Sequence, residues 1–266
     1  MGKVTEQKIK KFSQEVWNQY RRNRRDFPWR RTHDPYRIFI SEIMLQQTQT
    51  SRVEQKYVSF VKQFPNFHAL ASSPLRTILK AWQGLGYNRR ALLLQKAARV
   101  VVRDYGGKLP CDTRILKKLP GVGQSTAGAV VAFAFGISTP FIETNIRRAF
   151  IHYFFPRRKL VRDAEILPIL EETLRGKNSR EWHYALMDYG ALLGKAGPNP
   201  NVRSAHYAKQ TPFKGSDREL RGRIIRMVIE KKRLGPRTLA QKFGENISRI
   251  RRILSELKKE GFLSSY

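Results

Sequence analysis

Two glutamates, Glu42 and Glu143, stand in environments that give carboxyl groups different chemical roles. Glu42 lies in the apolar helical stripe at 38–45, where desolvation favours the protonated form and suits a carboxyl group to donate a proton. Glu143 directly precedes a helical pattern that begins at Asn145. These positions predict an acid and a second, separately placed carboxylate. The structural alternatives are an ion pair of Glu42 with a base such as Arg30, and simple helix capping by Glu143.

A glycine-containing turn between two helical patterns, near residues 113–135, is the next chemical feature. The run Leu-Pro-Gly-Val-Gly-Gln-Ser-Thr-Ala-Gly at 119–128 predicts a helix-hairpin-helix. Glycine allows the tight turn and lets phosphate oxygens approach the backbone, and the second helix starts with free N–H groups and a positive dipole end. The expected phosphate contacts, which position a protein without reading base sequence, are Gly121, Gly123, Gln124, Ser125 and Thr126.

Four further segments, in fixed order and spacing, carry a family resemblance. They are Phe-Pro-Trp-Arg at 27–30, Ser-Glu-Ile-Met-Leu-Gln-Gln-Thr-Gln at 41–49, Gly-Leu-Gly-Tyr at 84–87 and, about eighteen residues after the hairpin, Phe-Ile-Glu-Thr-Asn-Ile at 141–146. With the hairpin they resemble the helix-hairpin-helix DNA glycosylase superfamily, and within it the MutY-type adenine DNA glycosylases. The resemblance extends over roughly residues 12–190 and implies an all-α, two-lobed helical fold.

The resemblance also implies a reaction, hydrolysis of the N-glycosidic bond of a flipped adenine. Adenine is a poor leaving group as an anion, so an acid that protonates a ring nitrogen lowers the barrier while a second carboxylate stabilises the cationic sugar. By similarity Glu42 matches the general acid at N7 of the purine, and Glu143 takes the place of a catalytic Asp. The positions that match the base pocket of the family are Arg30, Ser125, Asn145 and Asp188.

Three positions bear on how the base is reached and released. Gln47 and Tyr87 match the residues that wedge into DNA, since a base removed from the stack leaves a hole that a planar or amide side chain must fill. The Gly-Leu-Gly before Tyr87 favours an exposed turn over a core aromatic. Ser125 stands where bifunctional relatives carry a Schiff-base lysine, which predicts an enzyme without lyase activity.

The composition favours a polyanionic partner. Lys and Arg total 52 against 21 Asp and Glu, a net charge of +31 spread along the chain, which exceeds the charge of about 2–8 that solubility requires. No apolar run approaches the roughly 20 residues of a transmembrane helix, and no apolar stretch follows Met1. We therefore expect a monomer that binds double-stranded DNA in the cytoplasm, associated with the nucleoid, and no membrane association.

The chain departs from the MutY-type pattern in three places, which makes it a divergent form. Glu143 is one methylene longer than the family's Asp. Residues 193–213 lack the four cysteines that hold an iron–sulfur cluster in the family, and Cys111 is the only cysteine, so we expect no cluster, no metal and no other cofactor. By this comparison we expect residues 216–266 to stand in the place of the Nudix-like domain with which the family reads 8-oxoguanine.

Helical periodicity dominates the chain, and strand-like alternation is nearly absent. We expect helices at 6–25, 38–45, 52–64, 73–79, 89–104, 112–118, 125–135, 145–154, 163–173 and 181–193. The stretch 194–215, rich in Gly, Pro, Asn and Lys, predicts a boundary between a glycosylase core at 1–215 and a second domain at 216–266. Helices expected at 217–233, 238–243 and 246–260, followed by an extended segment at 262–264, predict a small winged helix-turn-helix-like domain.

Three hypotheses of function follow. The first is monofunctional removal of adenine mispaired with 8-oxoguanine or guanine in base excision repair. The second is a thymine or uracil mismatch glycosylase on the same fold, which the missing recognition domain and Glu143 favour. The third is a DNA-binding module without catalysis. The sequence leaves open the preferred base and opposing base, the role of the C-terminal domain, the effect of Glu at 143 and any residual lyase activity.

Overall fold

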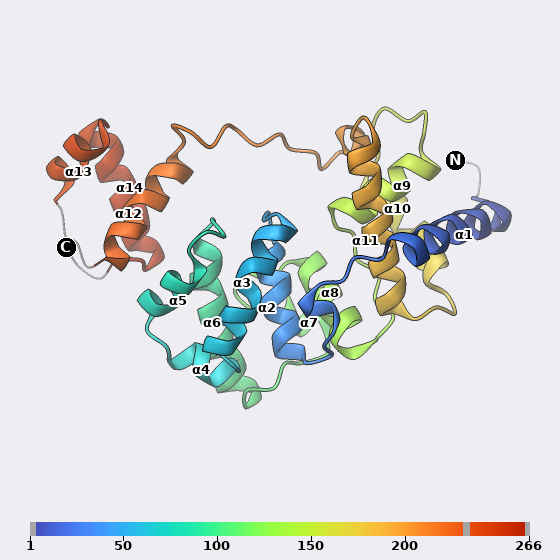
Figure 1. The fold of residues 1–266 in the computed structure, drawn as a ribbon, viewed down its shortest axis with the longest axis horizontal. Helices are drawn as coiled ribbons and strands as arrows, with labels where there is room; N and C mark the ends of the chain where they lie inside the picture. Colours follow the sequence, from blue (N-terminus) through green and yellow to red (C-terminus); the bar gives the residue numbers. More distant parts are fainter. Residues whose placement is uncertain (1–3, 231–234, 264–266) are drawn as a thin grey trace. The chain divides into compact units, whose positions relative to one another are not determined.

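The computed structural model describes residues 4–230 and 235–263. In these residues all regular elements are helices, apart from one isolated β-bridge between Val161 and Ser204. The predicted all-α fold is therefore confirmed (Figure 1). The order is α1 (Glu6–Asn23), η1 (Pro28–Arg30), α2 (Pro35–Leu45), α3 (Thr50–Gln63), α4 (Phe67–Ser72), α5 (Leu75–Trp82), α6 (Arg89–Tyr105), α7 (Thr113–Leu116), α8 (Gln124–Phe135), α9 (Thr144–Phe154), α10 (Asp163–Leu174), α11 (Ser179–Ala196), η2 (Pro200–Arg203), α12 (Asp217–Ile229), α13 (Pro236–Phe243) and α14 (Ile247–Glu260).

The chain divides into two compact units. The first, unit 1, comprises Met1–Glu42, Pro110–Lys118 and Val122–Lys209, and unit 2 comprises Ile43–Leu109, Leu119–Gly121 and Gln210–Tyr266. The division passes through α2 directly after Glu42, and the C-terminal helices share unit 2 with α3 to α6. A domain of its own from residue 216 stays a prediction.

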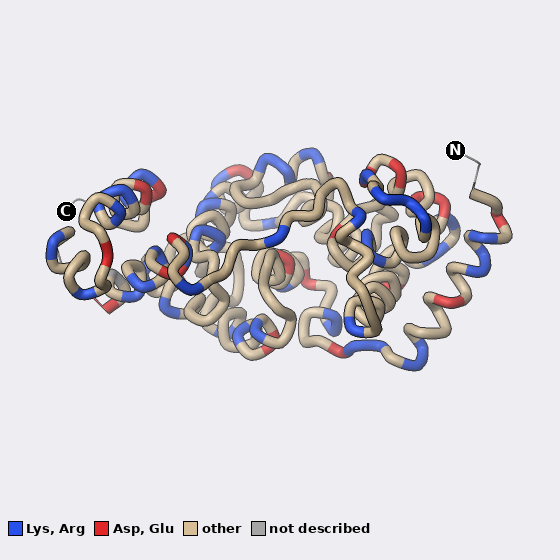
Figure 2. Tube along the Cα trace, turned by 90° about the horizontal axis from the view of Figure 1, so that it is seen from above, with Lys and Arg blue, Asp and Glu red and all other residues tan. Residues whose placement is uncertain are grey.

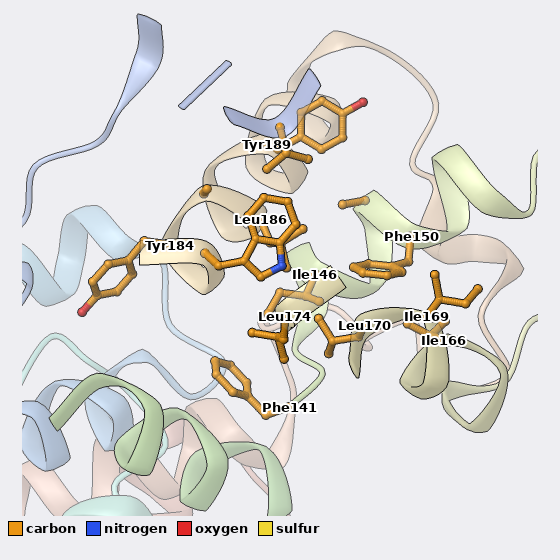
Figure 3. Packing of buried hydrophobic residues seen from close by; sticks show 14 of the residues in the cluster. Phe141, Ile146, Phe150, Ile166, Ile169, Leu170, Leu174, Tyr184, Leu186 and Tyr189 are labelled. Atoms are coloured by element: carbon orange, nitrogen blue, oxygen red, sulfur yellow. The ribbon is translucent and has the colours of Figure 1, made fainter. Parts of the chain in front are cut away.

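The core of unit 1 forms where α1, α9, α10 and α11 pack together, with α9 and α11 in the most extensive contact. Helix α1 contributes Phe12, whose ring lies 5.2 Å from that of Phe150 and 4.9 Å from that of Phe154, centroid to centroid. Figure 3 shows Phe150 among the apolar side chains that fill this cluster. Fully burying each such side chain contributes about 1.5–3 kcal/mol, so this cluster fixes α9 and α11, the helices that carry the candidate site.

Unit 2 is built around α3 to α6, preceded by the last residues of α2, and has its own aromatic core. Trp82 at the end of α5 is fully buried, and its ring centroid lies 5.7 Å from that of Phe60 on α3. The C-terminal helix α12 packs against α5. The helices α12, α13 and α14 follow one another in the predicted order, whereas the expected extended segment is a bend at Phe262 and Leu263, and Ser264 lies outside the described residues.

Candidate active site

Glu143 forms the N-cap of α9 and is held by three hydrogen bonds. Its Oε1 accepts from the backbone N–H of Asn145 at 2.7 Å and of Ile146 at 2.8 Å, and its Oε2 accepts from the side-chain amide of Asn145 at 3.2 Å. An ionised carboxylate has about four acceptor sites, so capping leaves acceptor capacity on this half-buried group. The capping role is real, and it also fixes the orientation of the carboxylate.

The pKa of Glu143 is raised above its ordinary value, mainly because burial disfavours the charged form. The backbone N–H groups of Asn145 and Ile146 and the positive charges of Arg147 and Arg148 act in the opposite direction and stabilise the carboxylate. The site therefore offers this side chain both desolvation and fixed positive partners.

Beneath Glu143, α11 approaches the first turn of α9 at a glycine. A Cβ atom on Gly190 would lie 2.0 Å from the carbonyl oxygen of Asn145, so only glycine fits there. Arg148 closes the contact: its Nη1 donates to the carbonyl of Gly190 at 2.8 Å and to Oδ1 of Asn145 at 2.9 Å, and its Nε donates to Oδ1 of Asn199 at 3.1 Å. The carboxylate of Glu143 thus rests on a turn that packing and hydrogen bonds hold rigidly.

Glu42 is the second carboxyl group of the site, half-buried on α2. Its pKa is raised to about 8, first because the surrounding protein atoms desolvate it and then because the negative charge of Glu143 opposes ionisation; Arg30 acts weakly in the other direction. At neutral pH Glu42 is consequently protonated. Both glutamates belong to unit 1, close enough for one charge to influence the other.

Arg30 is held by one face of α11, on which Arg180, Tyr184 and Asp188 recur at intervals of four residues. Asp188 accepts two hydrogen bonds from the Arg30 guanidinium, each of 2.8 Å, and the two side chains are only 5% and 3% exposed. The guanidinium carbon of Arg30 lies 4.3 Å from the centroid of the Tyr184 ring, and Arg180 donates to the Arg30 carbonyl at 2.9 Å. The alternative partner considered for Glu42 is thus bound to Asp188.

Asp188 carries a negative charge in this arrangement. Although burial alone would raise its pKa, the hydrogen bonds and positive charge of Arg30, assisted by Arg25, outweigh burial and hold the pKa below its ordinary value. Arg25 donates from Nε to Asp188 at 2.6 Å and from its backbone N–H at 3.1 Å. The carboxylate oxygens of Asp188 therefore accept hydrogen bonds from Arg25 and Arg30. Asp188 contributes to the site by holding Arg30 in place.

The predicted hairpin consists of α7, a turn and α8. Gly121 in the turn has φ +81°, a left-handed conformation that favours glycine, and its carbonyl accepts a hydrogen bond from Gln46 Nε2 at 3.1 Å. Gly123 forms the N-cap of α8, and no side chain caps this helix end. The start of a helix without a side-chain cap presents the kind of backbone N–H groups that bind an anion. Ser125, the second residue of α8, is half-buried.

Gln47 and Tyr87, the predicted wedge residues, share an unusual backbone. With φ 54° and 47° they are the non-glycine residues of positive φ in the described part of the chain, a conformation that costs energy and often occurs at functional sites. A single guanidinium ties their turns together. Arg90 donates to the carbonyls of Met44 at 2.8 Å and of Gly86 at 3.1 Å, to that of Leu85 at 3.2 Å, and to others nearby. These turns lie in unit 2.

Sequence reasoning did not identify several of these residues. Tyr184 and Arg180 were detectable, because they lie four and eight residues before Asp188 on one helix face. Arg148 lies three residues after Asn145 and was detectable in the same way. Arg90 gave no local signal for its link to the Gln47 turn, since Ile43, Met44 and Thr48 lie more than 40 residues before it.

The electrostatic surroundings are basic throughout. Figure 2 shows Lys and Arg distributed over the trace rather than gathered in one segment.

Among the residues that the structure describes, no group of three or more His, Cys, Asp or Glu residues is placed to hold a metal ion. An iron–sulfur cluster does not fit the donor set. Such a cluster is usually bound by four cysteine thiolates, and this sequence contains one cysteine, Cys111. In the described part of the chain no helix has the length and apolarity needed to cross a membrane.

Comparison with known proteins identifies relatives over most of the chain. Residues 40–174 match the family described as HhH-GPD superfamily base excision DNA repair protein. The adenine DNA glycosylase of Buchnera aphidicola subsp. Baizongia pistaciae is 36% identical over 197 residues, which cover 72% of this chain and 55% of the relative. The thymine/uracil-DNA glycosylase of Methanothermobacter thermautotrophicus is 36% identical over 196 residues, covering 73% of this chain and 89% of the relative.

A solved structure agrees with these matches. The structure of a thermostable thymine-DNA glycosylase superposes with a TM-score of 0.63 at 32% sequence identity, covering 70% of this chain and 87% of that chain. Relatives that are named for different bases therefore match this chain at the same sequence identity of 36%.

Proposed function

Because the chain belongs to the HhH-GPD superfamily of base excision DNA repair proteins, we propose that it is a monofunctional DNA glycosylase that removes adenine mispaired with 8-oxoguanine or guanine. The observation that carries this proposal is a pair of interacting carboxyl groups that differ in their fixed partners, although burial raises the pKa of both. Glu42 is protonated at neutral pH, and Glu143 is held by donors that favour its ionised form. Such a pair assists hydrolysis of a purine N-glycosidic bond, because one group protonates the leaving base and the other stabilises the cationic sugar.

In the proposed reaction Glu42 donates its proton to N7 of the flipped adenine. The bond between the base and C1′ of the sugar then breaks with its electron pair on a neutral purine, and positive charge develops on the sugar. The carboxylate of Glu143 stabilises this charge. Water then adds at C1′ and passes one proton to the carboxylate that Glu42 became, which leaves an abasic site and restores the acid. Asn145 keeps Glu143 oriented through its side-chain amide.

Arg30 serves the base pocket as a fixed element. Its charge is neutralised by Asp188 and its guanidinium lies against Tyr184, so it offers a planar, rigid surface rather than a mobile cation. Ser125 occupies the position at which bifunctional relatives carry lysine, which supports hydrolysis by water without a Schiff base. No iron–sulfur cluster or other cofactor takes part in this proposal.

DNA binding in this proposal relies on backbone groups and on charge. The start of α8, with Gly121, Gly123, Gln124, Ser125 and Thr126, binds a phosphate, while Gln47 and Tyr87 enter the stack from their strained turns. The net charge of +31 supplies the long-range attraction to duplex DNA. We propose that the protein acts as a monomer on the DNA of the nucleoid in the cytoplasm.

Removal of thymine or uracil is the second candidate. It is favoured by the thymine/uracil-DNA glycosylase whose length is 89% covered. A pyrimidine has no N7 that an acid could protonate. Removal of adenine therefore needs Glu42 as a proton donor, whereas removal of thymine or uracil does not. Under the second candidate the reaction would depend on Glu143 and hardly on a proton from Glu42.

A panel of duplexes tests both candidates. Adenine, thymine or uracil is placed opposite guanine or 8-oxoguanine, and abasic sites are developed with alkali under single-turnover conditions for the wild type, Glu42→Gln and Glu143→Gln. We expect adenine release that both substitutions reduce, with melting temperatures and duplex affinity confirming folded variants. Pyrimidine release that is insensitive to Glu42→Gln would establish the second candidate. Equal abasic-site formation by wild type and Glu143→Gln would exclude the role given to Glu143.

A further inference from the structure

The hydroxyl group of Tyr87 is held by two side chains from the C-terminal part of the chain. Its oxygen accepts a hydrogen bond from Gln210 Nε2 at 2.7 Å and another from Arg218 Nη1 at 2.9 Å. All three residues belong to unit 2. Tyr87 is thus joined to residues more than 120 positions away in sequence.

The donors are themselves fixed. Arg218 donates through Nη2 to the carbonyl of Thr211 at 2.5 Å and through Nη1 to Oε1 of Gln210 at 3.3 Å. Arg218 is the second residue of α12, and α12 packs against α5. At the other end of α12, the carbonyl of Ile229 accepts a hydrogen bond of 2.6 Å from Arg76 on α5. The hydrogen bonds to Tyr87 therefore come from a helix anchored to the segment that leads into the Tyr87 turn.

We propose that Gln210 and Arg218 are positioning residues for Tyr87, so that the C-terminal segment takes part in opening the duplex. The two donors fix the direction of the aromatic ring before DNA binds, and a pre-oriented side chain loses less conformational entropy when it enters the stack. This inference rests on the proposed function, because Tyr87 is a wedge only in a protein that flips a base. It gives the helices from α12 onward a role in recognition.

A simpler role for Arg218 would be direct contact with a DNA phosphate. The two roles differ in their dependence on the Tyr87 hydroxyl group. Tyr87→Phe keeps the ring and removes the oxygen that accepts both hydrogen bonds, so a residue that acts through this oxygen has no further effect in that background. A phosphate contact acts independently of the oxygen, and its loss lowers the salt dependence of binding by about one counterion.

The experiment is a double-mutant cycle with Tyr87→Phe, Arg218→Gln and the combined variant in the full-length chain. Affinity is measured for a duplex that carries a stable abasic-site analogue, at several salt concentrations. Each single substitution should weaken binding roughly two- to tenfold, the cost of immobilising one side chain, and the combined variant should bind no more weakly than either. Arg218→Lys, which keeps a donor, should recover part of the loss. Arg237→Gln on α13 is the charge-matched control, because Arg237 is exposed.

The binding measurements distinguish a positioning role of Arg218 from a direct phosphate contact. Multiplicative losses in the combined variant, with a reduced salt slope, would overturn the proposal in favour of a phosphate contact. Unchanged or tighter binding by a folded Arg218→Gln protein would also overturn it. Failure of the proposed function is recognised independently, since a wild type that releases no base from any duplex can still be carried through the binding cycle.

Discussion

Replacement of Glu42 by Gln gives the sharpest prediction of the proposed mechanism. The substitution keeps the size and a hydrogen-bonding group but removes the proton that the carboxyl group donates. General acid catalysis contributes about 10²–10⁴-fold to a rate, so we expect single-turnover release of adenine to fall by at least about a hundredfold. Binding to an abasic-site duplex should be nearly unchanged, because the lost interaction develops in the transition state.

The magnitude follows from the raised pKa of Glu42. With a pKa of about 8, about 90% of Glu42 is protonated at pH 7, whereas at the ordinary value of 4.5 only about 0.3% would be. The environment therefore increases the competent population about 300-fold. Above pH 8 the wild-type rate should fall about tenfold per pH unit, and at low pH it should fall as Glu143, whose pKa is also raised, takes up its proton.

The assay is single-turnover release of adenine between pH 5 and pH 10, with the wild type and Glu42→Gln measured in parallel. The wild type should give a bell-shaped profile, and Glu42→Gln should lose the alkaline limb while keeping the acidic one. Melting curves at each pH exclude unfolding as the cause of a lower rate. A wild-type rate that stays level to pH 10, or a Glu42→Gln rate equal to the wild type at pH 7, would refute the assignment of Glu42 as the acid.

Three further predictions concern stability. Gly190→Ala should destabilise the fold by about 1–3 kcal/mol and lower adenine release, because its Cβ would meet the carbonyl of Asn145; equal urea unfolding of variant and wild type would contradict this. Arg90→Met should cost about 1.5–3 kcal/mol, since carbonyls that accept from a charged donor lose it, and should weaken binding to abasic-site DNA. Glu42→Gln should raise the melting temperature at pH 9 but not at pH 4, because a raised carboxyl pKa destabilises the folded state as pH rises from about 4.5 through about 8; equal differences at both pH values would argue against it.

Most helices could be predicted because their apolar periodicity is strong, and the misses have local causes. Helix α4, Phe67–Ser72, is six residues long, too short to show a period of 3.6 residues more than once. Its beginning was nevertheless marked by Asn66, whose side chain accepts a hydrogen bond from the backbone N–H of Ala69. Helix α5 extends to Trp82, beyond the expected end at 79, since the fully buried Trp82 continues its apolar face.

The site was predictable where neighbours in sequence are neighbours in space. Glu143 and Asn145 interact within one helix start, so spacing alone brought them together. The Tyr87 turn shows the opposite case, because Arg218 lies more than 120 residues away and no local pattern could join them. The ion pairs that join α14 to α12 are also distant in sequence, since Arg249 and Arg252 both pair with Asp217 on α12.

The different fixed partners of the two glutamates explain why the proton of the pair stays on Glu42, although burial raises the pKa of both. Glu143 has three fixed donors at a helix start, which stabilise its charge, whereas Glu42 is desolvated by burial and is influenced by the charge of Glu143. Ionisation of Glu143 and protonation of Glu42 therefore support each other. The cap contributed by Glu143 is thus part of the chemistry. Because the helix start holds a negative charge on Glu143, that charge raises the pKa of Glu42 on α2 and keeps it protonated.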